Sequence, residues 1–212
     1  MKFDVEIKRS RRRSVAISVS HDNKITVRCP LGFSERRCYD FLNEKKDWID
    51  KVIKAHAAVI NENSDVLNYE KIYVFGKKVP LIISDKNKIS DSAVYVRNRS
   101  CVKRTFIKHF APQFIEKAVV ISKKIGLTAS DFSIRAYKSR WGCCDAKKRV
   151  AFNYLLFMLP EYLQEYVIVH ELCHTVYLNH SKKFWLLVSE FIPDYFDCRK
   201  QLKKYDFLTK LY

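Results

Sequence analysis

The hydrophobic pattern of this chain changes its period partway along, and this change limits the folds open to it. Apolar and polar residues alternate in short runs over 3–29, which is typical of strands with one buried face. From about Val102 the period becomes helical, and the segment beginning at Phe106 predicts a helix that ends at Gly126. The sequence therefore predicts an α+β protein.

The alternating part predicts a hairpin with a turn near Asp22 and Asn23, followed by a helix that Ser34 caps. Residues 61–68 read as a polar loop, and further strands are expected over 71–84 and 92–98, with a tight turn at Gly76. We therefore predict a β-rich N-terminal region with one helix over 1–100 and a second domain over 101–212.

In the second domain, two strands are expected around the segment RWGCCDAKK, over 131–139 and 149–157. Pro160 is placed to begin a helix, Ser181 to cap another, and a last helix is expected over about 194–206.

The charge balance favours acidic partners. Forty Lys and Arg against 23 Asp and Glu give a formal net charge of +17, and such a field attracts polyanions. The run KRSRRR at 8–13 is therefore either a nucleic-acid contact or the solvated tip of a hairpin. No RNA- or DNA-binding motif accompanies it.

The remaining composition bears on the compartment. The N-terminus is charged where a signal peptide needs an apolar run, and no stretch is long enough to span a membrane. The seven cysteines are odd in number and irregularly spaced, so reduced thiols and a cytoplasmic location are expected. Nothing in the sequence indicates an oligomeric state.

The segment VIVHELCHTVYLNHSKKFW, residues 167–185, holds three of the six histidines. His170 and His174 are four apart on a predicted helix, so their rings lie on one face and can reach one ion. Glu171 lies at the edge of that face. This H-E-x-x-H pattern predicts two zinc ligands and a carboxylate that takes a proton from the attacking water. A helix with solvated histidines is the alternative.

The third ligand has two candidates. A helix that ends near Leu178 and turns at Asn179, a residue tolerant of left-handed geometry, would bring His180 back to the metal. Glu190 on the next helix is the alternative ligand. Metzincins share the histidine spacing, but Tyr177 stands where they have glycine and no methionine follows.

These residues carry a family resemblance. The segments SRWGCC, VAFNYLLFMLP, HELCH and HSKKFW resemble the YgjP-like family of predicted zinc-dependent metallopeptidases, which is related to SprT-type and WLM-type zincin-like proteases. The resemblance implies a zincin-like catalytic domain over 101–212, one zinc ion on His170, His174 and His180, Glu171 as general base, and a peptide or protein substrate. Cys143 departs from the usual serine of the family.

Three further residues are candidates for binding substrate. Arg140 is placed to orient a carboxylate, Asn153 to position substrate or to hold the zinc helix, and Tyr195 to stabilise an oxyanion. Core packing is the alternative for Tyr195, and we expect Trp141 to pack on the helix and Gly142 to make a turn.

Two other functions stay open at this point. One is a zinc protease or zinc-binding protein that its basic surface recruits to DNA or RNA. The other is a non-proteolytic protein, either a metal-dependent hydrolase or a zinc scaffold. An acidic residue beside an open coordination position argues against the scaffold.

Overall fold

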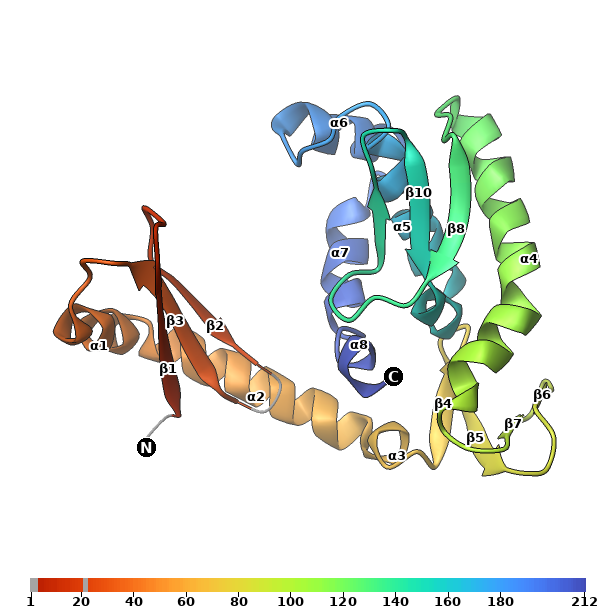
Figure 1. The fold of residues 1–212 in the computed structure, drawn as a ribbon, viewed down its shortest axis with the longest axis horizontal. Coiled ribbons are helices and arrows are strands. Elements are labelled where there is room, and N and C mark those ends of the chain that lie inside the picture. The colour runs from red at the N-terminus through yellow and green to blue at the C-terminus, as the bar shows by residue number, and fades with distance from the viewer. Residues whose placement is uncertain (1–3, 21–22) are drawn as a thin grey trace. The chain divides into compact units, whose positions relative to one another are not determined.

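A computed structural model describes residues 4–20 and 23–212 (Figure 1). The chain forms two compact units, one ending at Ser64 and the other spanning Asp65–Tyr212. The sequence placed a boundary near residue 100. The structure groups 65–100 with the larger unit because strands of this segment pack on the long helix α4 (Cys101–Ile125) and on residues 154–158.

The smaller unit holds three strands, β1 (Val5–Ser10), β2 (Ala16–Val19) and β3 (Ile25–Pro30), in the order β1-β3-β2. β2 and β3 are antiparallel, as the predicted hairpin requires, whereas β1 runs parallel to β3. The predicted turn falls partly on Asp22, outside the described residues. Asn23 has a φ of 61°, in the left-handed region that asparagine tolerates.

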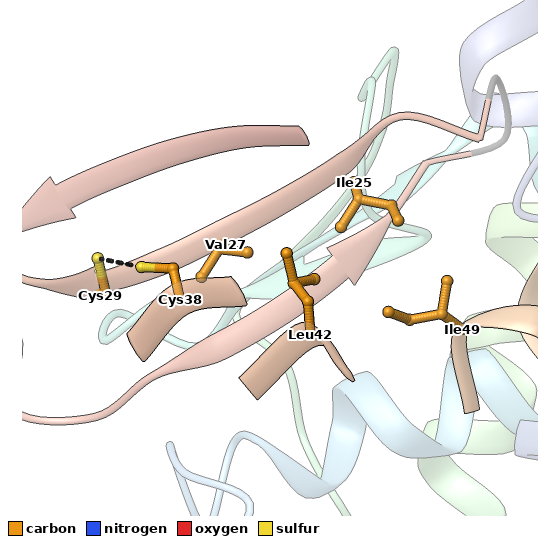
Figure 2. Close-up of a cluster of buried hydrophobic side chains, with 6 residues drawn as sticks. All are labelled: Ile25, Val27, Cys29, Cys38, Leu42 and Ile49. Carbon is orange, nitrogen blue, oxygen red and sulfur yellow. Dashed lines mark hydrogen bonds between the residues drawn. The ribbon is translucent and has the colours of Figure 1, made fainter. Parts of the chain in front are cut away.

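Two helices, α1 (Glu35–Glu44) and α2 (Lys46–Glu62), complete this unit. The Ser34 hydroxyl accepts a hydrogen bond from the Arg37 amide, so the predicted cap is confirmed. Figure 2 shows the buried cluster where strand β3 and both helices contribute side chains: Ile25, Val27, Cys29, Cys38, Leu42 and Ile49.

The larger unit begins with the short helix α3 (Ser64–Leu67, its first residue at the boundary), where the sequence predicted a loop. Val66 is completely buried there, which gives the polar segment an anchor. A sheet follows in the order β4-β5-β7-β6, formed by β4 (Lys71–Val74), β5 (Lys77–Ile83), β6 (Lys88–Ile89) and β7 (Val94–Val96). Gly76, with φ 79°, makes the predicted turn.

The 25-residue helix α4 (Cys101–Ile125) ends at Gly126, whose φ of 70° confirms the predicted left-handed stop. A second sheet has the order β8-β10-β9, with β8 (Asp131–Arg135), β9 (Gly142–Cys144) and β10 (Arg149–Asn153). β10 is central, parallel to β8 and antiparallel to β9. β9 is therefore an edge strand.

A 3-10 helix, η1 (Tyr154–Met158), replaces the end of the strand predicted to reach residue 157. Asn153 causes this change, because its side chain accepts the Leu155 amide and caps the turn. Four helices follow: α5 (Glu161–Cys173), α6 (Lys182–Phe191), α7 (Tyr195–Lys203) and α8 (Leu208–Leu211). α5 packs on β9 and β10, as Figure 1 shows. The α+β class is confirmed, and within the described ranges no helix is long and apolar enough to cross a bilayer.

Candidate metal centre

Helix α5 supplies the first two histidines of the site. Its sequence is apolar on nearly all sides, and Leu163, Val167 and Ile168 are at most 2% exposed, so the helix lies in the core. His170 is in its last turn and His174 is its C-cap. The helix ends at Cys173. The sequence predicted an end near Leu178, five residues later, and that prediction was wrong.

A tight turn follows that early end. The Thr175 hydroxyl donates to the Leu172 carbonyl, and the amides of Val176 and Tyr177 both donate to the Cys173 carbonyl. The turn carries the chain back across the end of the helix. Asn179 is not in the left-handed region as expected; its side chain instead accepts the Ser181 amide.

His180 comes back to the helix by this turn. Its Nε2 lies 3.1 Å from the Nε2 of His170 and 3.2 Å from the Nε2 of His174. Potential ligand atoms of these three residues lie within 4.8 Å of one another. Glu190, the alternative third ligand, is not in this group, which is the metal-type cluster found among the described residues.

Hydrogen bonding and burial keep the ring nitrogens available. The Nδ1 of His174 lies 2.8 Å from the Tyr177 carbonyl, to which only a protonated nitrogen can donate, so its Nε2 carries the lone pair. Burial, together with the charges of the other two histidines, lowers the pKa of His170 to about 3. Burial also lowers the pKa values of His174 and His180. The cluster is therefore neutral at pH 7.

The spacing of the three nitrogens suits zinc. Two imidazole nitrogens about 3 Å apart, as His180 Nε2 is from the Nε2 of each helix histidine, repel one another unless a proton or a cation lies between them. Zinc–nitrogen bonds of about 2.0–2.1 Å in a tetrahedron place the nitrogens roughly 3.3 Å apart. The observed 3.1 and 3.2 Å are close to that edge.

Aromatic packing from α6 holds the loop histidine in place. The Trp185 ring stacks on His180, with centroids 5.4 Å apart and planes at 20°. Phe184 is completely buried and contacts all three histidine rings. The Ser181 hydroxyl accepts the Phe184 amide, which confirms the predicted cap of α6. The tail HSKKFW thus positions His180 through its aromatic residues.

Glu171 is buried beside the histidines. Glu171 is only 6% exposed. This burial raises the pKa of its carboxyl group to about 8, while the positive charge of Arg140 acts to lower it. A carboxyl group with a pKa near neutrality is suited to taking up a proton and releasing it again.

Gly142 is the functional position that the sequence reasoning misread. It begins β9 instead of making a turn, and a Cβ at this position would lie 2.7 Å from the Glu171 Cγ and 2.8 Å from its Oε1. The strand can approach the carboxylate this closely only because residue 142 has no side chain. The sequence placed this glycine in the connection between two predicted strands, and no local signal indicated its contact with Glu171.

A cavity of about 380 Å³ opens over the histidines and Glu171. Strand β9, Arg140 and the apolar side chains of Val167, Leu178 and Leu202 all line it. The cavity combines the ligand nitrogens, the carboxyl group and an exposed sheet edge, within the size range of ordinary ligand pockets.

The structure separates the three residues expected to bind substrate. Arg140 is exposed and lines the cavity. Asn153 does not line it; its amide group donates to the carbonyls of Tyr137 and Arg140, 2.9 Å from each, and so fixes the segment before β9. Tyr195 does not line it either, and stacks on Trp185 at 5.2 Å.

The cysteines are not ligands of this site. All seven lie in described residues and none forms a disulfide. Burial, with the nearby Glu171 charge, raises the pKa of Cys144 to about 11, so this thiol of the cavity wall stays protonated at neutral pH.

Comparison with known proteins agrees with this site. The family model described as YgjP-like, metallopeptidase domain, matches residues 13–205. No curated protein matches the chain, and no solved structure matches it. The match spans most of the chain and includes all three histidines and Glu171. The chain belongs to the YgjP-like metallopeptidase domain family.

Proposed function

We propose that this protein is a zinc-dependent peptidase in which His170, His174 and His180 bind one zinc ion and Glu171 is the general base. The observation that carries the proposal is the convergence of three Nε2 atoms next to a buried carboxyl group on the wall of one cavity. Three protein ligands leave a fourth position for water or substrate, which is the arrangement of catalytic zinc sites.

The chemistry divides between the metal and the chain. Zinc, when bound, would act as a Lewis acid that polarises the scissile carbonyl and lowers the pKa of the attacking water. Glu171 in its ionised form, which a zinc ion bound beside it would favour, takes the proton from the attacking water and passes it to the leaving amine.

The substrate lies along β9. Among the described residues the strand pairs only with β10, on one side, so its other edge can add an extended peptide as a further strand. Arg140, at the start of this wall, binds a carboxylate or carbonyl of the substrate. Apolar substrate side chains next to the scissile bond fit against Val167, Leu178 and Leu202.

A zinc scaffold without activity accounts for the histidines but not for the rest of the site. A structural zinc site is closed by four protein ligands. Here the group has three, and the fourth side meets a cavity lined by Glu171. A non-proteolytic hydrolase would use the same groups and differ only in substrate.

Hydrolysis of a fluorogenic peptide library by the zinc-loaded protein tests the proposal. Glu171→Gln should abolish cleavage and leave one zinc bound per chain. Glu165→Gln, the same substitution on the same helix outside the cavity lining, should keep both. Full activity of the Glu171 variant would refute its role. Cleavage of esters but of no peptide would identify a non-proteolytic hydrolase.

A further inference from the structure

A second cavity, of about 430 Å³, lies in the larger unit and shares no lining residue with the metal site. Four tyrosines line it: Tyr69, Tyr137, Tyr154 and Tyr212. We ask what kind of ligand these walls would bind.

The cavity is cationic. Arg99, Lys103 and Lys138 line it and are exposed, and none of the three has an ion-pair partner among the described residues. No acidic residue of the described ranges lines it. Lys210 adds a further ammonium group beside the cavity, since its Nζ donates to the Lys138 carbonyl. An unneutralised group of cations next to a cavity favours an anion.

The beginning of α4 adds to this field. Ser100 and Val102 line the cavity, and the first turn of the helix contains no acidic residue. The Ser100 hydroxyl donates to the Asn98 side chain, so it does not cap the helix. The positive end of the helix dipole is therefore left without an acidic or side-chain partner at the cavity.

Planar groups face the same space. The Arg99 guanidinium lies 4.0 Å from the Tyr69 ring centroid, and Tyr212 meets Tyr69 edge to face at 5.6 Å. Guanidinium planes and aromatic rings are the surfaces on which proteins stack nucleobases. Simple phosphate binding would not need four tyrosines.

One hydroxyl group lacks a partner. The Tyr212 hydroxyl is buried and makes no hydrogen bond within the described residues. Leaving such a group unsatisfied is unfavourable. A ligand with polar edge groups, such as a base, would satisfy it after a small shift of the side chains that cover the hydroxyl.

We propose that this cavity binds a nucleotide, with the base among the tyrosines and Arg99 and the phosphate at Lys103, Lys138 and the start of α4. The ligand is either a free nucleotide or one unit of a single-stranded nucleic acid, because both present the same base and phosphate. This function is separate from peptide hydrolysis.

The two cavities share one segment of the chain. Tyr137 lines the nucleotide cavity, and its hydroxyl lies 3.1 Å from the Sγ of Cys143, which lines the metal-site cavity. Asn153 holds the backbone of this segment at Tyr137 and Arg140. A bound nucleotide would therefore lie one side chain away from the peptidase site.

Binding of AMP, of a single-stranded oligothymidylate and of inorganic phosphate to the full chain tests the proposal, by calorimetry at low salt. The double variant Arg99→Gln/Lys103→Gln should weaken nucleotide binding roughly tenfold or more. The matched control is Lys123→Gln/Lys124→Gln, which removes the same charge at the other end of α4, about 30 Å from Lys103 at about 1.5 Å per residue. The control should bind as the wild type does.

Tyr212→Phe separates the hydroxyl group from the fold. Because the hydroxyl has no hydrogen-bond partner among the described residues, its removal should leave the melting temperature equal to or above that of the wild type and weaken AMP binding roughly threefold to tenfold. Thermal unfolding of every variant confirms that the chain is folded.

The probes distinguish the two sources of the ligand. Tight AMP binding supports a free nucleotide, and oligothymidylate binding that AMP displaces only weakly supports a nucleic acid strand. Phosphate that binds as well as AMP, equal loss in the matched control, or no binding of any probe would overturn the proposal. Binding does not require hydrolysis, so the test stands whether or not the protein cleaves peptides.

Discussion

The histidine site has two arms that are built differently. His170 and His174 are held by the buried helix α5, where the backbone alone sets their spacing. His180 is held by a turn and by the rings of Trp185 and Phe184 on another helix. The helical arm therefore depends on local geometry, whereas the loop arm depends on tertiary packing.

The difference between the arms shows where the site is rigid. His170 is mostly buried, and its Nδ1 has no hydrogen-bond partner among the described residues, so packing fixes its ring. His180 is exposed and reaches its position only after the tight turn at 174–177. We expect changes in the helical arm to have larger effects than changes around the loop arm.

His170→Ala should have the largest effect. It removes a ligand from the rigid arm, and zinc affinity and peptidase activity should each fall by more than the roughly hundredfold that loss of an outer partner costs. His109→Ala, which removes an exposed histidine on α4, is the control and should change neither. Zinc content by atomic absorption is the measurement. Full zinc occupancy in the His170 variant would show that His170 is not a zinc ligand.

Gly142→Ala should reduce kcat by about a hundredfold and leave zinc bound, because displacement of a catalytic group by about 1 Å has an effect of this order. The new Cβ would lie 2.7 Å from the Glu171 Cγ, so the carboxylate must move. Gly32→Ala is the matched control, since its Cβ would meet nothing within 4 Å. Unchanged activity of the Gly142 variant would show that the contact with β9 does not position Glu171.

Trp185→Leu should weaken zinc binding by about tenfold through the loop arm alone. The stack at 5.4 Å that orients His180 is lost, while the three ligands remain. Trp48→Leu, at a half-exposed tryptophan of the smaller unit, is the control. Competition against a chelator gives the affinity, and a loss as large as that of His170→Ala would show that the two arms are not different.

Removal of the metal should change the backbone dynamics only slightly, and only in the segment that carries His180. Hydrogen exchange of the amides at 175–181 should speed up by a few fold in chelator, whereas the amides of α5 should keep their protection, since core packing holds them. Equal acceleration of hydrogen exchange in both segments would contradict the distinction between the helical arm and the loop arm.

The sequence predicted the parts of the molecule that depend on local rules. The caps at Ser34 and Ser181, the turn at Gly76 and the helix end at Gly126 follow from side-chain chemistry and backbone freedom, and all four are confirmed. The spacing of His170 and His174 is of the same kind.

Features that depend on distant residues were not predicted. The parallel pairing of β1 with β3 joins segments 20 residues apart, and the grouping of 65–100 with the larger unit depends on contacts with α4 and η1. Gly142 was predicted to make a turn. The structure shows that a side chain here would collide with Glu171, a residue 29 positions further along, which the local sequence does not reveal. The roles of Asn153 and Tyr195 also depend on such partners.

Zinc K-edge X-ray absorption of the loaded protein tests the central claim most directly. We expect three imidazole nitrogens and one oxygen at about 2.0–2.1 Å. His180→Ala should lower the count of imidazoles to two. A spectrum with sulfur ligands, or with three imidazoles still present after His180→Ala, would contradict the proposed centre.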